Sequence, residues 1–131
     1  MALADAPPEL QSATMMTASE LVENAIKYGE SVPAAPKIGV ALTLADNKVR
    51  IETVNGSRNP SRVAVLLVTV DQIAKAPDRE ALYLARLEQA MITPSASGQL
   101  GLYRIAFEGR FDLSCSYDDG VVRVTATRAL S

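Results

Sequence analysis

The chain of 131 residues contains no histidine and a single cysteine, Cys115. Without histidine it can have no histidine-based acid–base catalysis, no histidine-ligated zinc and no phosphohistidine of its own. With one cysteine it can form neither an intramolecular disulfide nor a cysteine metal cluster, and we expect Cys115 to be a small buried hydrophobe on a strand. These absences exclude several classes of enzyme before any motif is considered.

The chain also has no excess of positive charge and no long apolar run. Its 13 Lys and Arg against 15 Asp and Glu give a net charge of −2, whereas nucleic-acid binding calls for a basic surface. The longest apolar run, residues 63–68, is far too short to span a bilayer, and residues 1–9 lack the basic and apolar regions of a signal peptide. We therefore expect a cytoplasmic protein whose partners are neither nucleic acid nor membrane.

Length and composition are those of one globular domain. The hydrophobic fraction of 48% and the charged fraction of 21% are ordinary for such a domain, and 131 residues are enough for a single core. Pro8 suits the first turn of a helix. We expect residues 1–8 to be a flexible N-terminus and residues 9–131 to form the domain.

The first half of the chain predicts a helix followed by a hairpin. The helix is expected from about Glu9 to Tyr28, with Gly29 at its C-cap. After a proline-rich connector, residues 38–44 and 49–54 both alternate between apolar and smaller or polar side chains, the period of half-buried strands. A short turn joins them, which predicts an antiparallel pair.

The second half contains one ambiguous segment and three clearer ones. Residues 63–70 are apolar and rich in β-branched side chains, and periodicity cannot tell a buried strand from a helix in such a run. Asp78 is expected to cap a following helix, residues 100–108 predict a short helix, and the turn Asp118-Asp119-Gly120 predicts a second hairpin. Helices grouped on one face of a largely antiparallel sheet make the predicted class α+β.

The long N-terminal helix carries a polar stripe. Glu20, Asn24 and Lys27 are spaced at i, i+4 and i+7, so they lie within an arc of roughly 60° on one helix face. A general base, an oxygen ligand for a metal ion and a cation that reaches phosphate are the groups that a nucleotide site needs. Ordinary surface helices also carry polar faces, so the stripe alone leaves both interpretations open.

Three motifs together resemble a known superfamily. The pattern Glu20-x-x-x-Asn24-Ala25-x-Lys27-Tyr28 is similar to the N box of the GHKL ATPases, which include DNA gyrase B, heat-shock chaperones, histidine kinases, MutL and the anti-sigma-factor serine kinases. The segment Val-Asn-Gly-Ser-Arg-Asn-Pro at residues 54–60 resembles the first glycine box, and Gly-Gln-Leu-Gly-Leu at residues 98–102 resembles the second. With the final hairpin, the resemblance covers about residues 9–128.

The resemblance implies a Bergerat-type fold, a two-layer α/β sandwich in which a nucleotide lies between the helices and a mixed sheet. It implies ATP and Mg²⁺ as ligands, with Glu20 as the general base and Asn24 as the magnesium ligand. The other nucleotide-binding residues that it implies are Lys27, Asn55, Gly56, Gly98, Gly101 and Leu102. It also places a helix at residues 63–70, and we adopt that assignment.

The chain departs from the superfamily pattern at three positions. In the most natural register, Val54 replaces the aspartate that accepts a hydrogen bond from the adenine amino group, and Arg58 replaces a glycine of the same box. In the second box, Gln99 stands where glycine is usual. Asn55, one residue after Val54, could accept the adenine hydrogen bond through its amide oxygen.

These features support more than one function. The first is an ATP-binding GHKL-type protein kinase domain that phosphorylates Ser, Thr or His on a separate signalling protein in a bacterial two-component or partner-switching pathway, since the chain has no acceptor histidine. The alternative is a catalytically inactive pseudo-ATPase that serves as a protein-interaction module, and a third is a pocket for another small molecule. Both leading hypotheses call for a protein partner, and a homodimer is compatible with each.

Overall fold

The structure is a computed structural model that describes residues 2–93 and 99–130. A short 3-10 turn, η1 (Leu3–Asp5), precedes the long helix α1 (Pro8–Tyr28), and a hairpin of β1 (Gly39–Ala45) and β2 (Lys48–Gly56) follows. Next come α2 (Pro60–Lys75), α3 (Arg79–Ile92) and α4 (Leu100–Phe107), and a second hairpin is formed by β3 (Asp112–Asp118) and β4 (Val121–Ala129). The predicted α+β class and both predicted hairpins are confirmed.

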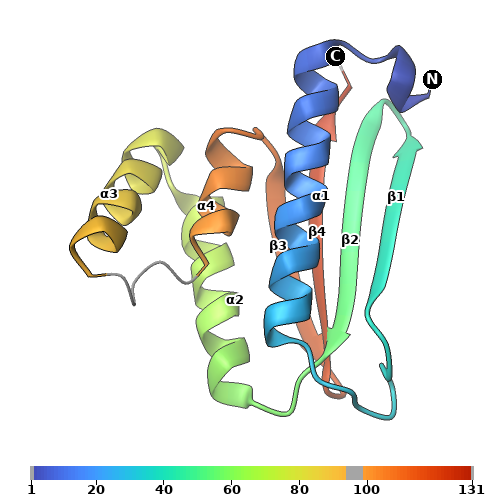
Figure 1. The fold of residues 1–131 in the computed structure, drawn as a ribbon, viewed down its shortest axis with the longest axis vertical. Coiled ribbons are helices and arrows are strands. Elements are labelled where there is room, and N and C mark those ends of the chain that lie inside the picture. The colour runs from blue at the N-terminus through green and yellow to red at the C-terminus, as the bar shows by residue number, and fades with distance from the viewer. Residues whose placement is uncertain (1, 94–98, 131) are drawn as a thin grey trace.

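The four strands form one open sheet in the order β1-β2-β4-β3. Helices cover one face of it, with α1 against β2 and α2 against β3, while α3 packs on α4 (Figure 1). On the other face Glu52 forms ion pairs with Arg50 and Arg123. The mixed sheet that the resemblance implied is not found, because the pairings β1–β2, β2–β4 and β4–β3 are all antiparallel.

A cluster of buried side chains fills the space between the helices and the sheet. The largest of them are almost fully buried and come from each part of the chain: Leu21, Ile51, Ile73, Ile105 and Phe111. Burying each such side chain contributes about 1.5–3 kcal/mol relative to leaving it exposed. Within the described part of the chain, no helix is long and apolar enough to cross a membrane.

Residues 63–70 are helical, as we assigned them. Asn59 caps α2 by accepting a hydrogen bond from the Arg62 N–H at 3.2 Å, and Pro60 occupies the first turn. Val63, Leu66, Val70 and Ile73 are buried at the helical spacing of three or four residues. The period is hidden in the sequence because exposed positions of α2 are also apolar, with Val65 and Val68 57% and 56% exposed.

Residues 2–8 make several contacts with the rest of the fold. Leu3 contacts the hydrophobic cluster through η1, and Ala6 is buried. The Gln11 side chain in α1 donates hydrogen bonds to the carbonyls of Ala4 and Ala6, at 3.2 and 2.8 Å. These contacts do not measure motion, so the flexible N-terminus expected over residues 1–8 stays a prediction.

The first hairpin forms as predicted, but its outer strand is not half-buried. Asp46 and Asn47 have φ angles of 54° and 59°, the left-handed conformation that a two-residue hairpin turn requires at both positions. In β1 only Leu44 is half-buried, and the other residues are exposed. The alternation of β1 was therefore read wrongly, because α1 covers β2 and leaves β1 beyond its edge.

Cys115 lies on β3, as expected, and is half-buried there. Burial raises the pKa of its thiol to about 11. Because the thiolate is the reactive form, we predict that iodoacetamide alkylates the native protein at mildly alkaline pH roughly 100-fold more slowly than the urea-unfolded chain. Quenched time points read by mass spectrometry measure both rates, and equal rates would contradict the buried position.

Candidate functional site

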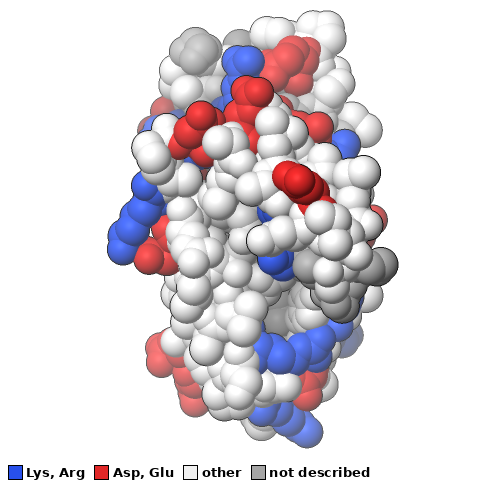
Figure 2. All heavy atoms as spheres, turned by 90° about the vertical axis from the view of Figure 1, so that its left-hand side faces the viewer, with Lys and Arg blue, Asp and Glu red and all other residues white. Residues whose placement is uncertain are grey.

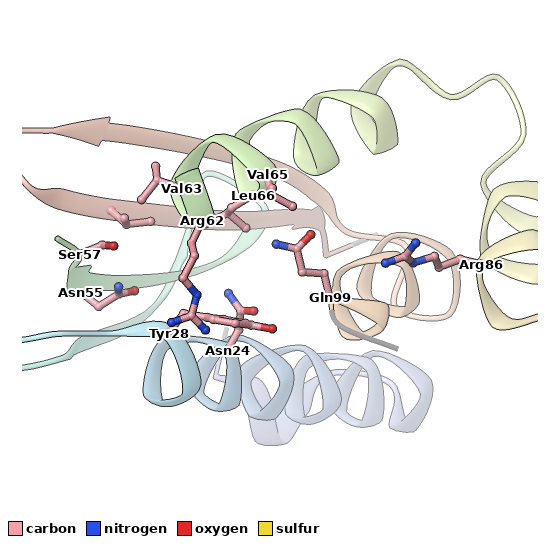
Figure 3. A pocket seen from close by; sticks show the side chains of 11 residues that line it. Asn24, Tyr28, Asn55, Ser57, Arg62, Val63, Val65, Leu66, Arg86 and Gln99 are labelled. Atoms are coloured by element: carbon pink, nitrogen blue, oxygen red, sulfur yellow. The ribbon is translucent and has the colours of Figure 1, made fainter. Parts of the chain in front are cut away.

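A cleft opens between the C-terminal half of α1, the end of β2 and the first turns of α2 (Figure 3). Its first part, which we call the α2 pocket, has a volume of about 240 Å³. Its apolar wall comes from Val63, Leu66 and Val122, and its polar groups include Asn24, Tyr28, Asn55, Ser57, Arg62, Arg86 and Gln99. Figure 2 shows the molecule hollowed on this side, with basic side chains beside the hollow.

A second pocket adjoins the first where α1 meets the start of α4. This α4 pocket measures about 190 Å³ and is lined by Glu20, Glu23, Asn24, Lys27, Tyr28 and residues 99–102. Asn24, Tyr28 and Gln99 line both pockets. The cleft is therefore elongated, with a largely apolar chamber at one end and a polar chamber beside a helix N-terminus at the other.

Asn24 stands at the junction of the two pockets. Its side chain is half-buried, and within the described residues its amide makes no hydrogen bond with the protein. Lys27, one turn away, rests against the Tyr28 ring, with Nζ 5.3 Å from the ring centroid. The structure thus places Asn24 and Lys27 on one pocket wall, and Asn24 has an oxygen free to bind a ligand.

Glu20 reaches the same wall, but its carboxylate is already engaged. Arg104 of α4 donates a hydrogen bond from Nη1 to Glu20 Oε1 at 3.2 Å, and its Nε donates to Glu108. These two carboxylates, Glu108 above all, raise the pKa of the Arg104 guanidinium. The Glu20 side chain is 22% exposed, and Arg104 contacts it through one carboxylate oxygen.

Gly101 allows α4 to approach α1 at this point. A Cβ built on Gly101 would lie 2.1 Å from Glu20 Oε2, so a larger residue would displace the carboxylate. Gln99 precedes the helix with φ of 67°, and its Oε1 accepts a hydrogen bond of 2.7 Å from Thr69 of α2. Leu102 is 2% exposed and belongs mainly to the core, and Gly98 lies outside the described residues.

Asn55, and not Val54, faces the cleft. Side chains of β2 alternate, so Asn55 shares the helix-covered face with buried Thr53, while Val54 lies on the other face. Asn55 Nδ2 donates to the Gly56 carbonyl at 3.0 Å, which fixes the amide orientation and leaves Oδ1 without a donor among the described residues. Of the two residues, Asn55 is therefore the one that lines the α2 pocket.

Gly56 does not line either pocket. It lies against the connector after α1, where Glu30 N–H donates to the Gly56 carbonyl at 2.8 Å. A Cβ on Gly56 would come within 2.4 Å of the Glu30 carbonyl oxygen and 2.5 Å of Val32 Cγ2. Position 56 therefore requires glycine because the connector backbone comes so close to it. Gly56 is not among the residues that line the two pockets.

Tyr28 and Arg62 are pocket residues to which the sequence assigned no role. The Arg62 guanidinium lies 4.6 Å from the centroid of the Tyr28 ring, so the two side chains bridge α2 and α1 across the cleft (Figure 3). Tyr28 follows Asn24 by four residues, a spacing that predicts that both side chains lie on the same face of the helix. Arg62 had no such signal, because its position depends on how α2 packs.

The donor set suits a metal ion that arrives with its ligand. In residues 2–93 and 99–130, no three His, Cys, Asp or Glu side chains are grouped so that they could hold a metal ion. Asn24 offers one amide oxygen, and Mg²⁺ commonly takes one or two protein oxygens and completes its octahedron with water and phosphate. The cleft therefore fits Mg²⁺ bound to a phosphate ligand and does not fit a metal held by protein alone.

No protein-family profile matches the chain, and no curated protein is significantly similar to it in sequence. Function is therefore inferred from the geometry of the cleft together with the three motifs.

Proposed function

We propose that the cleft binds ATP with Mg²⁺ and that the protein is a GHKL-type kinase domain acting on a separate signalling protein of a bacterial two-component or partner-switching pathway. The observation that carries the proposal is the meeting of an apolar pocket and a polar pocket at Asn24. A nucleotide has the same two parts, an aromatic base and an anionic phosphate chain. The resemblance of the three motifs to those of the GHKL ATPases supports the same assignment.

The α2 pocket suits adenine. Val63, Leu66 and Val122 supply apolar walls for a flat ring, and Asn55 Oδ1 is an acceptor whose direction is fixed by the bond from Nδ2 to Gly56. The adenine amino group can donate to that oxygen, whereas the guanine carbonyl would face it as a second acceptor. Asn55 therefore favours ATP over GTP.

The α4 pocket suits the phosphates. It lies beside the first turn of α4, whose N–H groups and helix dipole favour anions. Lys27 and Arg62 both rest on the Tyr28 ring and can turn toward a phosphate, and Asn24 would hold Mg²⁺ through its amide oxygen. When bound, Mg²⁺ neutralises negative charge on the phosphates.

Glu20 is the residue that we assign to proton acceptance. An acceptor hydroxyl that takes the γ-phosphoryl group releases a proton, and a carboxylate on the same helix face as Asn24 is placed to receive it. Arg104 donates a hydrogen bond to that carboxylate. The bond uses Oε1, so Oε2 is the oxygen that we assign to accept the proton.

Calorimetric titration tests the adenine pocket. With Mg²⁺ present, we expect wild-type protein to bind ATP at submillimolar concentration and GTP at least about tenfold more weakly, because one hydrogen bond is exchanged for a repulsive contact. Asn55→Leu removes both the hydrogen bond to ATP and the repulsive contact with GTP, so ATP should bind about tenfold more weakly and the preference for ATP over GTP should be lost. Gln72→Leu, which removes an exposed amide of α2, is the control and should bind as wild type. The absence of binding at millimolar ATP would contradict the proposal.

The ion pair between Glu20 and Arg104 favours a second candidate, the pseudo-ATPase module. In that case the protein keeps the fold and binds a protein partner, but it does not keep the nucleotide. Phosphate release separates the two functions: a kinase domain should show slow turnover that Glu20→Gln lowers about 100-fold or more without weakening ATP binding. No phosphate release above background would contradict the kinase and favour the module, whereas turnover unchanged in Glu20→Gln would contradict the role of Glu20 as proton acceptor.

A further inference from the structure

Strand β1 forms one edge of the sheet, and all of its residues except the half-buried Leu44 are exposed (Figure 1). Natural edge strands are usually protected by charged residues, proline or bulges, since their free N–H and C=O groups can pair with another strand. The seven residues of β1, Gly-Val-Ala-Leu-Thr-Leu-Ala, include none of these, and β1 pairs with β2 in one unbroken register. Nothing in its own composition prevents this edge from pairing.

The apolar side chains of β1 lie on the face that helices cover elsewhere in the sheet. Leu42 pairs with Ile51 and Val40 with Thr53, both buried, yet Leu42 and Val40 are themselves 50% and 53% exposed. Ile26 of α1 is also exposed, at 65%. An apolar strip therefore borders the open edge.

The charges at the two ends of β1 match a second copy of the same strand. Lys37 lies just before β1 and Asp46 just after it, and both are exposed. Two copies of β1 can pair antiparallel so that the apolar faces of both strands lie on the same side of the sheet. In one such register Leu42 lies opposite Leu42 of the other copy, and in a second register Ala41 lies opposite Ala41. Both registers bring Lys37 of one copy within one position of Asp46 of the other, at both ends of the pair. A parallel pair would instead place like charges together.

The other edge of the sheet is unsuited to the same association. Asp112 and Asp118 stand at the two ends of β3, so an antiparallel pair of β3 strands would place these carboxylates opposite each other. Like charges directly opposite on neighbouring strands are destabilising. In addition, α2 packs on the helix-covered side of β3. Of the two edges, β1 is the one complementary to itself.

We propose that β1 is a self-association surface, and that a second copy of this chain pairs with it across a two-fold axis to form a continuous eight-stranded antiparallel sheet. Under a two-fold axis the same contact, Lys37 of one copy near Asp46 of the other, occurs at both ends of the strand pair, as in any isologous interface. The proposal does not depend on nucleotide binding, since it uses neither pocket.

Sedimentation velocity over a micromolar concentration series tests the association. We expect a monomer–dimer equilibrium in the wild type. Leu42→Lys, which places two ammonium groups at the centre of the pair, should raise the dimer dissociation constant at least about tenfold. Val68→Lys is the matched control: Val68 is 56% exposed on α2, against 50% for Leu42, and its replacement should leave the dimer unchanged. Far-ultraviolet circular dichroism checks that both variants fold.

A crosslinking variant locates the contact independently. Leu42→Cys should form an intermolecular dimer with a short bismaleimide in good yield, whereas Val68→Cys should not. A wild-type protein that stays monomeric throughout the series would overturn the proposal. So would a dimer weakened equally by the two lysine variants, or one that Leu42→Cys fails to crosslink.

Discussion

Replacing Asn24 with alanine is expected to weaken the binding of Mg-ATP about 10- to 100-fold, the loss typical of a perturbed metal site. Asn24 lies at the junction of the two pockets, and in the described residues its amide oxygen has no protein partner to give up. The loss should therefore come from the metal–phosphate contact alone. Calorimetry with Mg²⁺ and with excess EDTA measures it, and the difference between Asn24→Ala and wild type should nearly vanish in EDTA.

Ser19→Ala is the matched control for this variant. Ser19 is exposed on the outer face of α1, so its replacement removes a polar group from the same helix without touching the cleft. It should bind Mg-ATP as wild type does. Equal losses in Ser19→Ala and Asn24→Ala would show that the helix, and not the metal contact, is responsible. Unchanged binding in Asn24→Ala would remove Asn24 from the site.

Gly56→Ala is expected to lower the free energy of unfolding by about 2 kcal/mol, within the range for overpacking. Its new methyl group would meet the Glu30 carbonyl oxygen at 2.4 Å and Val32 at 2.5 Å, and the backbone carbonyl cannot turn aside. Urea unfolding followed by circular dichroism gives the value. Because Gly56 lines neither pocket, any loss of ATP binding should follow only from lost stability.

Gly39→Ala provides the comparison. Gly39 also lies in a strand, but the nearest atom to its added methyl group would be Val54 Cβ at an ordinary 3.7 Å. Its replacement should change the free energy of unfolding by less than about 1 kcal/mol. If Gly39→Ala destabilised the protein as much as Gly56→Ala, the close approach of the connector to Gly56 would not be the cause.

The sequence predicts the secondary structure well where capping and turn residues mark the ends. Asp78 caps α3 through a 3.0 Å bond from the Ala81 N–H, and Asp119-Gly120 turns the second hairpin with φ of 52° and 77°. These signals are local, so they can be read from a single chain. For residues 63–70 the pattern was undecided, because exposed valines stand where a helix normally has polar residues.

Burial in the sheet was harder to predict because it depends on distant elements. Alternation in β1 is the same whether or not a helix lies over the strand, and α1 reaches only as far as β2. Likewise, counting from the glycine box places Val54 at the adenine position, yet the pleat of β2 turns Asn55 toward the helices. Only the pairing register and the helical layer decide these two points.

The candidate site was predictable on one helix and not across helices. The spacing of Glu20, Asn24 and Lys27 puts them on one wall of the α4 pocket, as the structure has them. Two contacts between elements had no sequence signal: Arg104 bound to Glu20, 84 positions away, and Arg62 stacked on Tyr28. Both involve arginines whose positions follow from helix packing, and both bear on whether the cleft is open and its carboxylate free.

The most direct test of nucleotide binding is a crystal structure of the protein with Mg²⁺ and a non-hydrolysable ATP analogue. We predict the adenine ring against Val63 and Leu66 with its amino group on Asn55 Oδ1, the phosphates beside the first turn of α4, and Mg²⁺ on Asn24. An empty cleft at millimolar analogue, or density for the analogue elsewhere on the surface, would contradict the proposed function.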